Sequence, residues 1–180
     1  MRVFIAIDLP DELKEEIFKI YNKIKFIRAK FVEKENLHIT LKFLGELQPP
    51  KVKEIQEALK SIEFEKFKIR VKGLGAFPDF NRIRVLWLGI AEGKEKLLEL
   101  QRKVDIICKK FGFPLEKEYV PHITIARIKQ VLNKEKFLEI IDELKNIDFG
   151  YFEVKEFKLK QSILRPQGPL YKDLEKYSLK

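Results

Sequence analysis

Several residue types are scarce in this chain, and each shortage excludes a class of protein. A single cysteine, Cys108, among 180 residues leaves no partner for an internal disulfide. No apolar run reaches the length of a membrane span. The apolar run at the N-terminus ends at Asp8 after five residues and lacks the cleavage site of a signal peptide. We therefore expect a cytoplasmic protein that does not associate with membranes.

The sequence also lacks the signatures of two large groups of enzymes. It has no Gly-x-x-x-x-Gly-Lys loop, which argues against ATP hydrolysis and ATP-dependent ligation. It has no Gly-x-Ser-x-Gly either, and no serine stands in a nucleophile context; the serines are Ser61, Ser162 and Ser178. Cys108 lies in an apolar stripe with helical spacing, which favours a buried structural thiol over a nucleophile.

The composition is that of a folded and basic protein. Apolar residues make up 45% of the chain and charged residues 36%, enough for a hydrophobic interior under a strongly hydrated surface. The formal net charge of +9 favours a polyanionic partner. A lysine-rich solvated surface explains the charge equally well, because lysines alternate with glutamates and form no uninterrupted basic block. Charge alone leaves both explanations open.

The order of expected elements repeats in the two halves, with an offset of about eighty residues. Each half has a buried strand, a helix, a second strand, a second helix and an alternating strand. They span 3–7, 11–24, 37–44, 49–62 and 67–71, then 85–88, 94–111, 122–128, 133–144 and 152–159, with a last strand over 170–179. The sequence predicts an α+β fold with two lobes related by an approximate twofold axis. Antiparallel strands would line a central cleft, with helices outside, in one bilobal domain over 1–180 without a clear linker.

Every histidine and every threonine of the chain belongs to one of two copies of a tripeptide. The copies are His38-Ile39-Thr40 and His122-Ile123-Thr124. Side chains alternate along a strand, so the histidine and threonine of each copy share a face. The apolar neighbours of the first copy would point into the core: Leu37, Ile39, Leu41 and Phe43. If the lobes are related by a twofold axis, His38 and His122 face each other across the cleft.

Two facing imidazoles suit an in-line displacement at phosphorus. One histidine would take a proton from water, and the other would give a proton to the departing alkoxide. Each threonine hydroxyl would donate to a non-bridging phosphate oxygen. A single histidine in a strand is usually structural, but two of them in equivalent repeats, each followed by a threonine, favour catalysis. Two histidines without a neighbouring cluster of carboxylates or cysteines fall short of a zinc site, so we expect neither metal nor cofactor.

At these motifs the chain resembles the 2H phosphoesterases, and among them the RNA 2',3'-cyclic phosphodiesterases once named 2'-5' RNA ligases. The resemblance runs nearly end to end, and the paired His-x-Thr is its specific part. It includes segments 2–10 (RVFIAIDLP), 36–45 (NLHITLKFLG), 75–78 (GAFP), 84–89 (RVLWLG), 121–127 (PHITIAR) and 162–171 with its Pro166, Gly168 and Pro169.

The resemblance implies a metal-independent enzyme with a basic cleft that opens the cyclic phosphate to a 2'-phosphomonoester. It assigns His38 as the proton donor to the leaving 3' oxygen and His122 as the proton acceptor from water. The residues themselves indicate the pair and not its polarity. The implied partners are RNA ends with a 2',3'-cyclic phosphate, tRNA fragments among them, with no obligate protein partner. Joining such an end to a 5'-hydroxyl would be a side activity.

Two basic residues near the motifs are candidates for substrate binding. Arg127 matches a family arginine, but alternation from His122 places it on the opposite face unless a bulge or the strand end re-aims it. Lys42 would share the face of His38 and either contact the RNA backbone or lie in solvent. Phe43 and Trp87 could stack on bases, but their apolar surroundings favour core packing.

Other functions stay open at this point. One is a related 2H phosphodiesterase that acts on 2'-5' oligonucleotides or on small cyclic nucleotide phosphates. Another is a non-catalytic module that binds RNA ends, although binding alone needs no pair of titrating groups.

Overall fold

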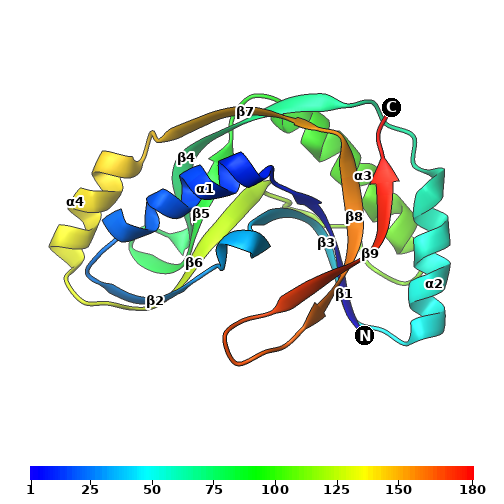
Figure 1. Ribbon diagram of the computed structural model, residues 1–180, viewed down its shortest axis with the longest axis horizontal. Helices are drawn as coiled ribbons and strands as arrows, with labels where there is room; N and C mark the ends of the chain where they lie inside the picture. The colour runs from blue at the N-terminus through cyan, green and yellow to red at the C-terminus, as the bar shows by residue number, and fades with distance from the viewer.

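Two antiparallel sheets, flanked by four helices, make up the fold in the computed structural model, which describes residues 1–180 (Figure 1). One sheet has the strand order β3-β1-β8-β9 and the other β2-β6-β5-β4-β7. The strands are β1 (Arg2–Asp8), β2 (Ile27–Phe31), β3 (His38–Glu46), β4 (Phe67–Asp79), β5 (Arg82–Ile90), β6 (His122–Val131), β7 (Asp148–Val154), β8 (Glu156–Ile163) and β9 (Leu170–Ser178). The helices are α1 (Asp11–Lys19), α2 (Pro49–Ala58), α3 (Lys94–Lys109) and α4 (Lys134–Leu144).

The predicted repeat is confirmed, and its two halves are interleaved. The order β3-β1-β8 in one sheet corresponds to β6-β5-β4 in the other. After its second helix the first half crosses directly to the other sheet, whereas the second half forms β7 before it crosses, because the strand expected over 152–159 is two strands, β7 and β8. β4 therefore pairs with β5, and β8 pairs with β1. In Figure 1, α1 and α4 lie on the side of the five-stranded sheet, and α2 and α3 on the side of the four-stranded sheet. Each sheet therefore contains strands from both halves of the chain.

One hydrophobic cluster of 37 buried residues runs through both sheets and their helices. The apolar run of β1 is buried from Val3 to Ile7, as expected for a strand covered on both faces. The stripe of α3 faces this core and includes Cys108, where burial raises the pKa of the thiol to about 12. A thiol of this kind is structural. None of the helices is long and apolar enough to cross a membrane.

Both motif strands contain a β-bulge just after the threonine. In β3, Thr40 pairs with Ala6 and Lys42 with Ile5, so Leu41 is an extra residue. In β6 the same place is taken by Ile125, because its two neighbours pair with consecutive residues of β5. A bulge reverses the alternation of side chains beyond it. Positions 38–43 and 122–127 consequently show the same order of burial.

The bulge in β3 overturns one expectation from the sequence. Strict alternation places Phe43 in the core, but its side chain is 57% exposed. The extra residue at Leu41 puts two consecutive side chains, Leu41 and Lys42, on the buried side and turns Phe43 outward. Phe43 thereby joins the side of the strand that carries His38.

Candidate active site

A cavity of about 540 Å³ lies between the two motif strands, which are in contact. Its wall includes all four residues of the two motifs: His38, Thr40, His122 and Thr124. Both histidines are half-buried and line the cavity. The structure thus brings together the four residues that the sequence singled out from two distant parts of the chain.

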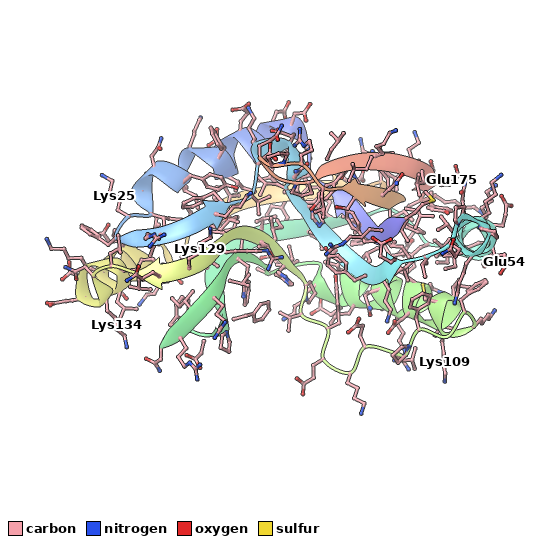
Figure 2. All side chains as sticks on the ribbon, turned by 90° about the horizontal axis from the view of Figure 1, so that it is seen from below. Lys25, Glu54, Lys109, Lys129, Lys134 and Glu175 are labelled. Carbon is pink, nitrogen blue, oxygen red and sulfur yellow. The ribbon has the colours of Figure 1, made fainter.

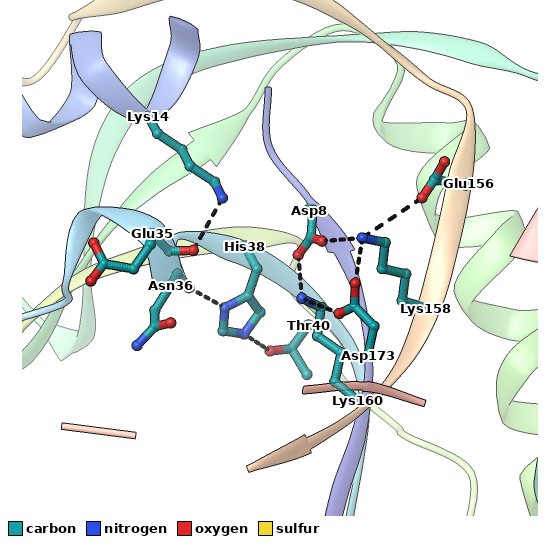
Figure 3. Close-up of polar contacts among 10 residues, drawn as sticks. All are labelled: Asp8, Lys14, Glu35, Asn36, His38, Thr40, Glu156, Lys158, Lys160 and Asp173. Atoms are coloured by element: carbon teal, nitrogen blue, oxygen red, sulfur yellow. Dashed lines mark hydrogen bonds and ion pairs between the residues drawn. The ribbon is translucent and has the colours of Figure 1, made fainter. Parts of the chain in front are cut away.

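His38 is held at both ring nitrogens (Figure 3). Its Nδ1 lies 2.6 Å from the carbonyl oxygen of Asn36, and its Nε2 lies 2.9 Å from the Thr40 hydroxyl. A carbonyl oxygen only accepts, so Nδ1 carries a proton and donates it. In the neutral ring, Nε2 then accepts from the hydroxyl. The ring also packs against Phe4 and meets the edge of Tyr171, with centroids 5.3 and 5.4 Å away.

His122 is held in the same way at Nδ1, while its Nε2 makes no hydrogen bond to Thr124. Its Nδ1 lies 2.6 Å from the carbonyl oxygen of Val120, again two residues before the histidine. Its ring is packed by Phe77 and Trp87, with centroids 5.0 and 5.7 Å away. Both imidazoles therefore have the same tautomer, with Nε2 as the nitrogen available for proton transfer.

The surroundings favour the neutral form of both imidazoles. Burial lowers the pKa of His38 to about 4, and the charges of Lys160 and His122 act in the same direction. Burial also lowers the pKa of His122, with a contribution from Arg127. The backbone carbonyls that accept from Nδ1 oppose both shifts. An anion bound between the rings would favour their protonated forms.

A cluster of four charged side chains lies beside His38 on β1, β8 and β9 (Figure 3). Asp8 is the cross-strand partner of His38. The ammonium of the buried Lys160 is 2.7 Å from Asp8 and 3.1 Å from Asp173, and Lys158 bridges the same two carboxylates. Burial raises the pKa of Asp8, but the two ammonium groups outweigh it and hold this pKa below its usual range. A third carboxylate, that of Glu156, lies 3.9 Å from Lys158 at the edge of this cluster.

Lys42 borders the cavity, but its ammonium already has three protein partners. Its side chain is 4% exposed, and Nζ lies 2.7 Å from Asp105, 2.7 Å from the carbonyl oxygen of Pro114 and 3.4 Å from Glu116. The alternative of a solvated lysine is therefore wrong, because the bulge at Leu41 turns Lys42 toward the buried side. A contact between Lys42 and phosphate stays a prediction, and these partners occupy the donors that it would need.

The partners of Lys42 belong to a network that supports the open edge of β3. Asp105 is fully buried and also accepts from the backbone N–H of Glu116 at 2.7 Å. Gln101 donates to the carbonyl oxygen of Leu41, and the Tyr119 hydroxyl donates to that of Thr40. These residues escaped sequence reasoning. Gln101 and Asp105 were visible only as two polar residues, four apart, within the apolar stripe of α3.

Arg127 lies on the cavity wall, on the side of His122 and Thr124. The bulge at Ile125 re-aims it, as contact with a substrate requires, and its side chain is exposed. Phe43 occupies the equivalent place in β3 and also lines the cavity. Trp87 is half-buried and packs on the ring of His122. Its role at the site is thus to support a histidine.

The loop between β8 and β9 forms another part of the wall. Gln167, Gly168 and Pro169 line the cavity. The loop is fixed to the segment before His38, because Asn36 donates to the carbonyl oxygen of Pro169 at 2.8 Å and Arg165 pairs with Glu33 at 3.0 Å. Asn36 therefore fixes this loop through its side chain and orients His38 through its backbone carbonyl. Nowhere in the chain do three or more histidine, cysteine, aspartate or glutamate side chains form a group that could hold a metal ion.

Comparisons with known proteins agree with this geometry. The model of the family described as LigT like Phosphoesterase matches the chain twice, over residues 7–87 and 88–171. A protein from Methanocaldococcus jannaschii named RNA 2',3'-cyclic phosphodiesterase is 45% identical over 177 residues, which cover 98% of this chain and 100% of that protein.

Two solved structures share the fold over 99% of this chain and 97% of their own. TT0787 of Thermus thermophilus has a TM-score of 0.78 at 31% identity, and Escherichia coli LigT complexed with 3'-AMP has a TM-score of 0.82 at 25% identity. The chain belongs to the LigT-like phosphoesterases of the 2H superfamily. One match of the family model to each half agrees with the interleaved repeat.

We predict that the buried pair of Lys42 and Asp105 can be replaced but not broken. In the variant Asp105→Ala, a buried ammonium loses its main partner, so the free energy of unfolding should fall by about 3–5 kcal/mol. The double variant Lys42→Met with Asp105→Leu should recover most of this loss. Urea unfolding of both variants at neutral pH measures the difference. A loss under about 1 kcal/mol in the single variant, or no recovery in the double one, would contradict the structural role of the pair.

Proposed function

We propose that this chain hydrolyses the 2',3'-cyclic phosphate at the end of an RNA and leaves a 2'-phosphomonoester. The observation that carries the proposal is the pair of imidazoles with the same tautomer on one cavity, each with a threonine two residues later. The name of the relative from M. jannaschii, RNA 2',3'-cyclic phosphodiesterase, supports the same activity. E. coli LigT has been solved in complex with 3'-AMP, a nucleotide with a phosphate on its ribose, and this also supports the proposal.

In the proposed reaction the cyclic phosphate lies between the two motif strands. Nε2 of His122 takes a proton from a water molecule, whose oxygen forms a new bond to phosphorus. The bond from phosphorus to the 3' oxygen breaks, and Nε2 of His38 gives its proton to that oxygen. The hydroxyls of Thr40 and Thr124 donate to the non-bridging oxygens, where negative charge accumulates. Solvent then restores the starting protonation of both rings.

The direction of proton transfer follows the family resemblance, because the tautomer that both rings share does not distinguish the donor from the acceptor. The proposed donor has to be protonated when the substrate is bound, although burial lowers the pKa of His38 to about 4. The negative charge of the phosphate favours the imidazolium and compensates for this shift. The Thr40 hydroxyl would then leave Nε2 and turn to the phosphate. A 5'-hydroxyl that attacks phosphorus in place of water, with the 3' oxygen again leaving, would give a 2'-5' bond.

The direct test uses oligoribonucleotides that end in a 2',3'-cyclic phosphate. We expect the protein to convert them to products with a 2'-phosphate, resolved from the 3'-phosphate isomers by chromatography. Small cyclic nucleotide phosphates and 2'-5' oligonucleotides serve as comparison substrates. A clear preference for either of them, or tight binding of RNA ends without turnover, would contradict the proposal.

Both histidines should be essential for turnover. We predict that His38→Gln and His122→Gln each lower kcat by about 10²–10⁴-fold, because each removes one proton-transfer group. Binding of the 2'-phosphorylated product, measured by titration, should largely remain. As a matched control, Thr124→Ser keeps the hydroxyl and should retain activity, whereas Thr124→Val should lose it. Full turnover in either histidine variant would rule out the mechanism.

The pH dependence should differ between kcat/KM and kcat. A base has to be neutral and an acid protonated, so activity is lost below the pKa of the base and above the pKa of the acid. Burial lowers the pKa of both free histidines below 6.5, that of His38 to about 4, so kcat/KM should be bell-shaped with an acidic maximum. Bound phosphate raises the pKa of the acid, so the alkaline limb of kcat should lie at higher pH. Alkaline limbs of kcat and kcat/KM at the same pH, or a flat pH profile, would contradict this prediction.

Activity should not depend on a divalent metal ion. The proposed roles of proton transfer and charge stabilisation are filled by the two imidazoles and the two hydroxyls. We therefore predict the same kcat before and after dialysis against a chelator. A loss that a divalent ion reverses would point to metal catalysis instead.

A further inference from the structure

Four exposed basic side chains gather on the cavity side of β2 and β6. Lys30 and Arg127 are direct cross-strand partners, and both line the cavity. Farther from the cavity, Arg28 pairs with Gln130, and Lys129 is the extra residue of a bulge beside them. The opposite face of these strands packs against the core through Ile27, Ala29 and Ile128. We call the four residues Arg28, Lys30, Arg127 and Lys129 the β2–β6 track.

The cations of the track have no carboxylate within 4.0 Å, in contrast to three less exposed cations of the sheets. Lys42 pairs with Asp105, Lys160 with Asp8, and Arg70 with Asp148. Lys30 and Arg127 lie directly opposite each other on neighbouring strands. Like charges in such a pair destabilise a sheet. A ligand with several negative charges would relieve this repulsion.

The opposite rim of the cavity carries two glutamates, of which Glu118 has no cation within 4.0 Å and Glu116 lies 3.4 Å from the Lys42 ammonium. Glu116 and Glu118 line it from the segment between α3 and β6, just before His122. Arg127 comes five residues after His122, which corresponds to about 15 Å along a strand. In Figure 2, Lys129 lies along β6, and Lys109 lies at the end of α3, from which the segment with Glu116 and Glu118 returns to β6. The candidate site therefore lies between a rim that attracts phosphate and a rim that repels it.

We propose that the β2–β6 track binds the phosphates on the 5' side of the reacting end, and that Glu116 and Glu118 exclude any phosphate beyond it. This rests on the proposed function and adds the direction of the bound RNA. In a chain that ends in a 2',3'-cyclic phosphate, every other phosphate lies on the 5' side. The charges of the two rims match this distribution. They select a chain end over an internal position, where phosphates would continue on both sides.

The test compares cyclic-phosphate substrates of one, two, four and six nucleotides. With the wild-type protein, kcat/KM should rise with length until the track is filled and then level off. The measured quantity is the ratio of kcat/KM for the tetranucleotide to that for the mononucleotide. Arg28→Gln and Lys30→Gln should each lower this ratio by about threefold to fivefold. The double variant Lys155→Gln with Lys176→Gln removes two exposed charges elsewhere and should leave the ratio unchanged.

Salt and circular RNA provide two further measurements. The slope of log affinity against log salt for a 2'-phosphorylated tetranucleotide should become shallower by about 0.7 for each track residue removed. A circular single-stranded RNA should inhibit the wild-type protein much less than the linear tetranucleotide does. In Glu118→Lys that difference should shrink. Equal inhibition of the wild-type protein by circle and tetranucleotide would overturn the exclusion by the acidic rim.

The outcomes separate this inference from the proposed function. If no cyclic phosphate is opened, the proposed function fails, and binding of 2'-phosphorylated oligonucleotides still measures the length dependence. If hydrolysis occurs but the ratio is near one in the wild-type protein, the track is refuted. The same holds if the two track variants keep the wild-type ratio, or if the control double variant lowers it as much as they do.

Discussion

One extra residue in each motif strand determines which side chains reach the cavity. Without the bulges, alternation would put Lys42 beside His38, and it would turn Phe43 and Arg127 toward the core. With them, Leu41 and Ile125 absorb the extra residue, and Phe43 and Arg127 line the cavity instead. A bulge leaves backbone groups without ladder partners. In β6 the carbonyl of Ile125 accepts from the backbone of Val32, whereas in the edge strand β3 the carbonyl of Leu41 accepts from a side chain, Gln101.

This difference explains why the two halves, built on one plan, have unequal surroundings. β6 is flanked by strands on both sides, so backbone groups stabilise its bulge. β3 has a strand on one side only, and its other side is supported by α3 and the segment that follows it, through Gln101, Tyr119 and the pair of Lys42 with Asp105. The same segment ends at Val120, whose carbonyl orients His122. The support of one motif strand is thus coupled to the orientation of the histidine on the other.

Sequence reasoning identified the repeated elements and the motif residues, and it missed the place of the bulges and the buried ion pairs. The two lobes, the helices outside and the four motif residues followed from periodicity and from the doubled tripeptide, and the structure brings those four residues to one cavity. The bulges could not be read from the sequence, because a single extra residue leaves the apolar pattern almost intact. The ion pairs of Lys42 and Lys160 were hidden among 37 basic and 28 acidic residues. Tertiary contacts alone select which of these meet.

The asymmetry matches the chemistry that we propose. In an in-line displacement the entering and leaving oxygens need equivalent help, and two imidazoles with the same tautomer supply it. The substrate is not symmetric, because its chain continues on one side of the reacting phosphate only. Equivalent positions in the two strands accordingly differ where they would meet the rest of the RNA: Phe43 in β3 corresponds to Arg127 in β6. A duplicated fold can therefore keep the proton-transfer pair alike while its flanking residues diverge to give the site a direction.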